Sequence, residues 1–142
     1  MLNTASITSR WASPVLGLLR IVTSLLFMSH GTQKLFLFPS GGMTEPFPVF
    51  TLLGTAGLIE FAGGLLLLIG IFPRFVAFIM CGEMAVAYFK AHAFQGFLPL
   101  VNHGELAVLY CFVFLNFMVS GGGSFSLDSY LKKRRASRNS AV

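Results

Sequence analysis

Four long apolar segments follow one another along the chain, separated by short segments rich in glycine, proline or charge. The segments are Pro14–Phe38, Phe47–Phe72, Arg74–Phe94 and His103–Ser120. A helix that crosses a membrane needs roughly 20 mostly apolar residues, and each segment is near that length. The pattern therefore predicts an all-α integral membrane protein with four spanning helices.

The breaks between these segments predict the connections. Residues 39–46 (PSGGMTEP) and residues 95–102 favour two outward loops, and Phe72-Pro73-Arg74 favours a tight turn. After the last segment, residues 121–142 are expected to form a cytoplasmic tail. Ser126 in this tail is a candidate N-cap for a short interfacial helix. Because little chain lies outside the spans, residues 1–142 are expected to form a single membrane domain.

Composition agrees with this interpretation. Hydrophobic residues make up 55% of the chain and charged residues 11%, whereas a soluble domain carries about 25% charged residues. The mean hydropathy is +0.77. The sequence contains no glycine-rich nucleotide loop and no serine-hydrolase elbow. These features argue against a soluble globular enzyme.

The charges outside the spans predict the orientation. Seven bases face only Glu45 and Asp128, so their sum, 7 − 2 = +5, equals the net charge of the chain. The seven bases are Arg10, Arg74, Lys132, Lys133, Arg134, Arg135 and Arg138. With four spans they all fall on one side, which the positive-inside rule makes cytoplasmic. We expect both termini there, with the KKRR run near anionic lipid rather than on nucleic acid.

Three of the five carboxylates lie within the apolar segments: Glu60, Glu83 and Glu105. A carboxylate at membrane depth costs at least a few kcal/mol. Such a group usually pairs with a cation, lines a polar cavity, or acts on a proton or a substrate.

Projection at 100° per residue gives each predicted helix one polar or small-residue stripe. The stripes are Arg20, Ser24, Phe27, Gly31 and Lys34; Ala56, Gly57, Glu60, Gly63 and Gly64; Glu83, Ala87 and Lys90; and Glu105, Leu109, Phe112, Asn116 and Ser120. Small residues around Glu60 would let a neighbouring backbone approach closely. If the four stripes face one another, the fold is a four-helix bundle with a polar core and a lipid-facing apolar surface.

Depth along the helices separates the polar residues into two layers. Arg20, Glu60 and Glu83 are expected to meet in the inner layer as a buried charge cluster. In one interpretation these groups neutralise one another and fix the helix register. In the other they form a proton or substrate site, because two carboxylates share one cation.

The outer layer is a candidate ligand site. Its candidate binding residues are His30, Gln33, Lys34, Lys90, His103 and Glu105. These side chains could form the polar edge of a quinone pocket walled by Phe36, Phe38, Phe94 and Phe97, or serve as ordinary interfacial anchors. Weaker alternatives are a haem between His30 and His103, and a metal held by these histidines and Glu105; no HxxxH or CxxC spacing supports a metal.

The two cysteines, Cys81 and Cys111, fall outside the polar stripes. Cys81 lies about 160° from the stripe of Glu83, and Cys111 about 120° from that of Glu105. We therefore expect small packing residues rather than a membrane dithiol centre.

The assembled motifs resemble the DoxX family of small bacterial membrane proteins, over roughly residues 15–130. The matching elements are Arg20, the HGTQKLF run of residues 30–36, GLIEFAGGLLL of residues 57–67, IGIFPR of residues 69–74, MAVAYF of residues 84–89, His92, Pro99, NHGE of residues 102–105, LYC of residues 109–111 and SLD of residues 126–128.

The resemblance implies a four-helix protein of the bacterial inner membrane. Relatives are described as subunits of thiosulfate:quinone oxidoreductase, or as partners in membrane redox and stress-defence complexes. We therefore expect a subunit or accessory factor of a quinone-linked redox or detoxification process, with quinone as the candidate cofactor. The alternatives are a structural or assembly partner of a membrane complex, a self-associating chain included, and a small proton-coupled carrier.

Overall fold

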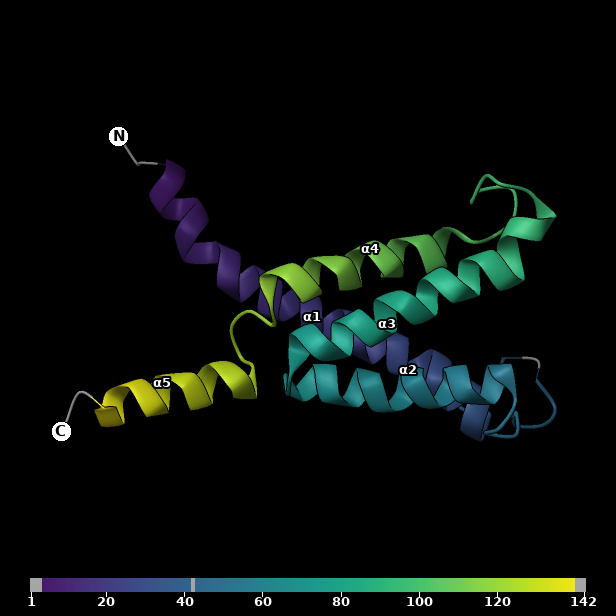
Figure 1. The fold of residues 1–142 in the computed structure, drawn as a ribbon, viewed down its shortest axis with the longest axis horizontal. Coiled ribbons are helices and arrows are strands. Elements are labelled where there is room, and N and C mark those ends of the chain that lie inside the picture. The colour runs from purple at the N-terminus through teal and green to yellow at the C-terminus, as the bar shows by residue number, and fades with distance from the viewer. Residues whose placement is uncertain (1–3, 42, 140–142) are drawn as a thin grey trace.

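The computed structural model describes residues 4–41 and 43–139, and this part of the chain contains helices and loops but no strand. The helices are α1 (Thr4–Phe36), α2 (Leu52–Ile69), α3 (Pro73–Ala87), α4 (Glu105–Ser120) and α5 (Leu127–Asn139) (Figure 1). A π-helical turn, η1 (Tyr88–His92), and a 3₁₀ turn, η2 (Ala93–Gln95), continue α3. The all-α prediction is confirmed.

Three helical segments of the described chain are long and apolar enough to cross a membrane. They are Ser9–Phe36, Leu52–Ile69 and Pro73–Gln95. The fourth, α4, is apolar but has only 16 residues, and it begins two residues later than predicted. Three of the four predicted spans therefore have the required length and composition.

The first helix begins earlier than the sequence suggests. Pro14 lies inside α1, and the residues from Thr4 onward are already helical. The predicted first segment, Pro14–Phe38, therefore starts too late, because a proline inside a helix removes one hydrogen bond without always ending the helix. The first turns of α1 run at an angle to the remainder (Figure 1).

The second helix is shorter at both ends than the predicted Phe47–Phe72. Residues 48–51 form a turn, in which the Thr51 N–H donates to the Pro48 carbonyl. The Thr51 side chain then caps the helix by accepting from the Gly54 N–H at 3.1 Å. Gly70 ends the helix in the left-handed conformation with φ of 76°. Only glycine adopts this conformation without steric cost, so the stop is encoded locally.

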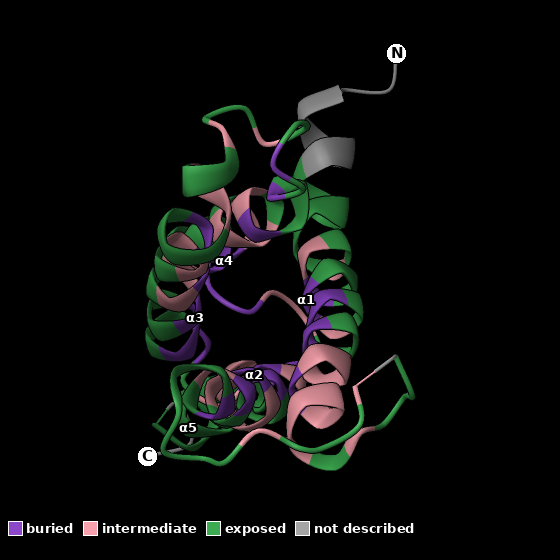
Figure 2. Ribbon diagram, turned by 90° about the vertical axis from the view of Figure 1, so that its right-hand side faces the viewer, coloured by how far each residue is buried: buried purple, intermediate pink, exposed green. Residues whose placement is uncertain are grey.

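The first four helices surround a common centre, as the end-on view shows (Figure 2). The closest packing joins α1 to α2 and α3 to α4, whereas α2 and α3 meet more loosely. The Phe27 ring joins α1 to α4, because its centroid lies 5.1 Å from that of Tyr110 and 4.8 Å from that of Phe114.

The centre is more apolar than predicted. Its buried hydrophobic residues are Phe27, Leu67, Val76, Ala77, Met80, Met84, Tyr88, Ala107, Phe114 and Phe117. The predicted α1 stripe is buried at Arg20, Ser24 and Phe27. The predicted α4 stripe is wrong: Phe112 is 64% exposed, and Asn116 is exposed with it. Large aromatic side chains fill the interior better than the few polar groups of α4, so that helix turns its polar face outward.

The two ends of the molecule are formed by different elements. The start of α1, the α2–α3 turn and α5 lie at one end, and the two long loops lie at the other (Figure 1). Ser126 caps α5 as predicted, since its hydroxyl oxygen accepts from the Ser129 N–H at 3.2 Å. The final residues of the predicted tail, 140–142, lie outside the described residues.

Candidate functional site

The site begins with a close crossing of α1 and α2. A Cβ atom on Gly31 would lie 2.5 Å from the backbone nitrogen of Phe61, and one on Gly57 would lie 2.9 Å from Cβ of Lys34. Such distances leave no room for a side chain, so glycine is required on both helices. The predicted close approach at the small residues around Glu60 is confirmed, and it brings the Lys34 side chain alongside α2.

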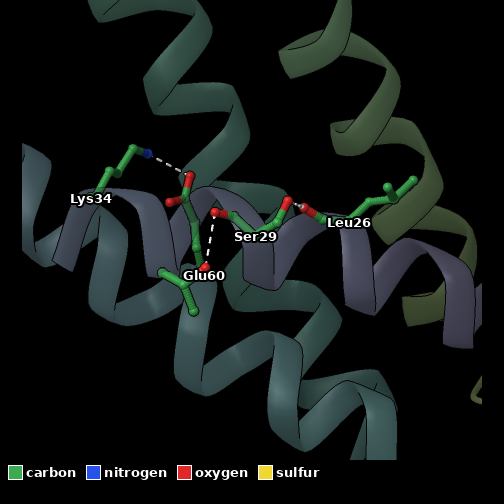
Figure 3. A network of polar contacts seen from close by, with 5 residues as sticks. Leu26, Ser29, Lys34 and Glu60 are labelled. Atoms are coloured by element: carbon green, nitrogen blue, oxygen red, sulfur yellow. Dashed lines mark hydrogen bonds and ion pairs between the residues drawn. The ribbon is translucent and has the colours of Figure 1, made fainter. Parts of the chain in front are cut away.

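Lys34 and Glu60 form an ion pair across this crossing (Figure 3). The Lys34 Nζ atom donates to Glu60 Oε1 at 2.6 Å, and the two side chains are 22% and 3% exposed. Within the described residues it is the sole salt bridge. The sequence assigned Lys34 to the outer layer. The structure corrects this assignment, because a lysine side chain is long enough to reach one turn or more along its helix.

One oxygen on each of two carboxylates lacks a hydrogen bond. Glu60 Oε2 and Glu83 Oε2 are both buried and have no partner in the described part of the chain. A buried polar atom without a partner is uncommon and often marks a functional position. One ammonium and two carboxylates sum to 1 − 2 = −1, so uptake of one proton would make the group neutral.

Glu83 and Lys34 also line a pocket between α2 and α3. The pocket has a volume of about 280 Å³. Its surface is almost entirely apolar, with walls that include Leu53, Ile59, Ile79, Val86 and Ala87. Lys34, Glu83 and Lys90 are the charged residues that contribute to the lining. The predicted stripe of Glu83, Ala87 and Lys90 therefore faces this pocket, whereas Met80, Met84 and Tyr88 supply the core face of the same helix.

Arg20 does not join the two glutamates. Its side chain is fully buried and donates to four backbone carbonyls: Leu67 and Leu68 near the end of α2, and Gly122 and Phe125 in the segment before α5. The predicted charge cluster of Arg20, Glu60 and Glu83 is therefore wrong in its cation. Arg20 satisfies carbonyls that the end of a helix leaves unpaired, which is a structural role.

The remaining outer-layer candidates are dispersed. His30 stacks edge-on with the Tyr110 ring at 6.1 Å, and Gln33 donates to the Pro39 carbonyl at 3.4 Å. His103 and Glu105 are exposed at the start of α4. The structure therefore brings Lys34 and Lys90 to the pocket and leaves these four side chains with other surroundings.

The predicted aromatic walls are also in other places. Phe36, Phe38, Phe94 and Phe97 are all exposed, so they do not enclose the outer layer. Chain folding instead builds a polar network around Asn102, which is buried and donates to the Gly96 carbonyl at 2.5 Å. Sequence reasoning missed the partners of this network, Tyr88 and His92. The network around Asn102 holds the loop before α4 in place.

The two cysteines face each other. Cys81 Sγ on α3 and Cys111 Sγ on α4 are 3.6 Å apart, and both residues are half-buried. The expectation of two small packing residues outside the polar interior did not include this contact. It relied on the polar stripe of α4 facing inward, and that helix is turned the other way.

A metal site is not formed by the candidate residues. Among the residues that the structure describes, no three His, Cys, Asp or Glu side chains cluster in a way that could hold a metal ion. The alternative of a metal held by His30, His103 and Glu105 is therefore contradicted by the fold.

Comparison with known proteins places the chain in a family. The family model for DoxX matches residues 15–93, which include Lys34, Glu60 and Glu83. An uncharacterized protein of Haemophilus influenzae is 43% identical over 128 residues, covering 84% of this chain and 92% of that protein. A second uncharacterized protein of the same organism is 32% identical over 68 residues, covering 48% and 45%. No solved structure gives a significant match. The chain is thus a membrane protein that belongs to the DoxX family.

Proposed function

We propose that this protein is a quinone-binding subunit or accessory factor of a redox or detoxification process in the bacterial inner membrane. Its four apolar helices would cross the membrane as a bundle, with both termini in the cytoplasm. The observation that carries the proposal is the Glu83 carboxylate, which lines an apolar pocket together with Lys34 and has one buried oxygen without a partner.

The pocket suits the head group of a quinone. A quinone ring is apolar on its faces and carries two carbonyl oxygens, which need hydrogen-bond donors. Lys34 and Lys90 supply ammonium donors, and the aliphatic walls suit the ring. Ligand pockets combine apolar walls with a few polar groups in this way. At about 280 Å³ the pocket would hold a ring, and the isoprenoid tail would extend into lipid.

The charges provide the second requirement, which is proton transfer. Reduction of a quinone to a quinol consumes two electrons and two protons. Glu83 borders the pocket, and Lys34 connects that pocket to Glu60 through the 2.6 Å ion pair. A proton held by this group would lie next to the ring. The electrons would be exchanged with a protein partner.

The distribution of bases supports the proposed orientation. Ser13, Arg74 and Lys132 line one cavity at the end where α1 begins and α5 emerges. The tail adds Lys133, Arg134 and Arg135 at the same end. Cytoplasmic loops are enriched in Lys and Arg, which supports a cytoplasmic position for this end.

The direct test is quinone retention. The protein is purified from bacterial membranes in mild detergent and its bound lipids are measured by mass spectrometry, for wild type and Glu83→Gln. We expect a quinone near stoichiometric amounts in wild type and at least a tenfold loss in Glu83→Gln. Glu105→Gln is the matched control, because Glu105 is exposed and outside the pocket lining. Equal retention in all three proteins would contradict the proposal.

A proton-coupled carrier is the second candidate. The two unpartnered oxygens, on Glu60 and Glu83, favour it, because a carrier needs a carboxylate that gains and loses a proton. Proteoliposomes distinguish the two functions. Proton-driven solute flux that Glu60→Gln abolishes would support a carrier, and retention of quinone without flux would support the first proposal.

An assembly role is the third candidate. The exposed face of α4 carries Phe112, Asn116 and Ser120, and the Ser120 hydroxyl bonds to Asn116 Oδ1 at 3.2 Å. Polar side chains on a membrane helix often serve contacts with another helix. This face could therefore bind a second copy or another membrane subunit. Cross-linking from a cysteine placed at Asn116, compared with one at Val86, would test the contact.

A further inference from the structure

We propose that Cys81 and Cys111 form a redox-active dithiol that exchanges two electrons with a membrane quinone. Oxidation would join α3 to α4 by a disulfide. The inference rests on the proposed quinone-linked function, and it places a two-electron carrier within the chain itself.

The geometry is the first argument. The two sulfur atoms are 3.6 Å apart, although the residues are 30 positions apart in the sequence and lie on different helices. The thiol of Cys111 also bonds to the backbone carbonyl of Cys81 at 3.6 Å, so its sulfur points toward α3. A disulfide requires sulfurs about 2.05 Å apart, so the two sulfurs must come about 1.5 Å closer for the bond to form.

The surroundings are the second argument. The chain has two cysteines in 142 residues, and both lie at this contact. The helices that carry them, α3 and α4, are one of the two closely packed pairs, so the sulfurs are held near each other. Both residues are half-buried rather than sealed in the core. A lipid-soluble oxidant therefore has access from the bilayer.

The chemistry balances without another reactant. Two thiols and one quinone give one disulfide and one hydroquinone: an S–S bond forms and two S–H bonds break. Two electrons and two protons pass to the two quinone oxygens. The reverse reaction returns the thiols and regenerates the quinone. The dithiol would thus carry the electrons and supply the protons of this exchange, and the pocket containing Glu83 would bind the ring.

The pair and the pocket lie on one turn of α3 but on different faces of the helix. Cys81 precedes Gly82 and Glu83, and both of those residues line the pocket. Cys81 itself lies about 160° around the helix from Glu83 and faces α4. A quinone released from the pocket would therefore have to move around α3 through lipid to reach the sulfurs.

The test measures the thiols directly. Reduced full-length protein in proteoliposomes is mixed with a fully substituted short-chain benzoquinone, whose ring has no free position for thiol addition. Free thiols are then counted by alkylation under denaturing conditions and intact mass. We expect both thiols of wild type to disappear together as an intramolecular disulfide, and dithiothreitol to restore them. The quinone should be reduced in a 1:1 ratio to disulfide, since each step moves two electrons.

The matched control moves one thiol by a single residue. Cys111→Ser combined with Phe112→Cys keeps two cysteines, but rotates the second by about 100° to an exposed position. We expect this variant to form at least tenfold less intramolecular disulfide. Wild type that stays reduced under these conditions, or a control that oxidises equally, would overturn the inference.

The Glu83→Gln variant distinguishes failure of the dithiol inference from failure of the proposed quinone pocket. Quinone bound by wild type without any loss of thiols would overturn the dithiol and leave the quinone pocket standing. Thiol oxidation at equal rates in wild type and Glu83→Gln would support the dithiol and contradict the pocket. Oxidation that Glu83→Gln slows at least tenfold would support both.

Discussion

Lys34 Nζ on α1 lies 2.6 Å from Oε1 of Glu60 on α2. The contact joins the HGTQKLF run of α1 to the GLIEFAGG run of α2, and the glycines at the crossing make it geometrically feasible. It also leaves the second oxygen of Glu60 without a hydrogen bond in the described chain, and the same holds for one oxygen of Glu83 on α3. The most charged part of the interior is therefore only partly neutralised, which is the property that a proton-handling site needs.

Removing the lysine should destabilise the fold. Lys34→Met leaves the Glu60 carboxylate buried without a cation, and breaking a buried pair in this way costs about 3 kcal/mol. Thermal denaturation in detergent should show a clear fall in the melting temperature. Lys90→Met, which removes an exposed lysine at the same pocket, should change it little. The double variant Lys34→Met/Glu60→Gln should recover part of the loss, because position 60 then carries no unpaired charge. A single variant as stable as wild type would show that the pair contributes little.

Arg20 should be essential for the packing of the C-terminal segment. It is the common partner of carbonyls in α2 and in the loop before α5. Arg20→Met leaves several buried acceptors unsatisfied, each at a cost of about 1–3 kcal/mol. We expect reduced yield of folded protein and faster proteolysis near residues 121–126. Arg10→Met, at an exposed position, is the control. Equal proteolysis of the two variants would contradict this role for Arg20.

The crossing of α1 and α2 should not tolerate an added methyl group. Gly31→Ala would place Cβ 2.5 Å from the Phe61 backbone nitrogen, so the two helices must separate. Separation weakens the Lys34–Glu60 contact as well. Gly82→Ala serves as control, because a Cβ there meets no atom within 4 Å, and alanine favours a helix by up to about 1 kcal/mol. The melting temperature should fall in the first variant and hold or rise in the second. The opposite order would refute the close crossing.

The basic helix α5 should bind anionic lipid. Its four consecutive bases, residues 132–135, are exposed. Each base near an anionic surface contributes about 1 kcal/mol, and salt screens the attraction. Hydrogen exchange of the α5 amides should slow in nanodiscs that contain anionic lipid, relative to zwitterionic lipid. Replacing the four bases by glutamine should remove the difference, and high salt should reduce it. Exchange that ignores lipid charge would argue that α5 has another partner.

Much of the fold follows from the sequence because its signals are local. Apolar segment length and the Ser126 cap depend on neighbouring residues, so helices can be recognised without tertiary contacts. The Thr51 cap and the Gly70 stop are equally local signals, although the predicted span Phe47–Phe72 ran past both. The family resemblance rests on such runs and is confirmed. The importance of Glu60 and Glu83 also follows from sequence, because a charge inside an apolar helix is costly wherever it points.

Tertiary structure decided which groups meet. The rotation of α4 is set by packing of Phe114 and Phe117 against the other helices, a non-local property that outweighs its weak polar stripe. That rotation exposes Asn116 and brings Cys111 to Cys81. The partner of Glu60 depends on the reach of a flexible side chain: Lys34 extends to it, while Arg20 turns to backbone carbonyls. Sequence by itself determined the helices and the charged residues at membrane depth. The structure alone determined their pairing, because pairing depends on the rotation and spacing of whole helices.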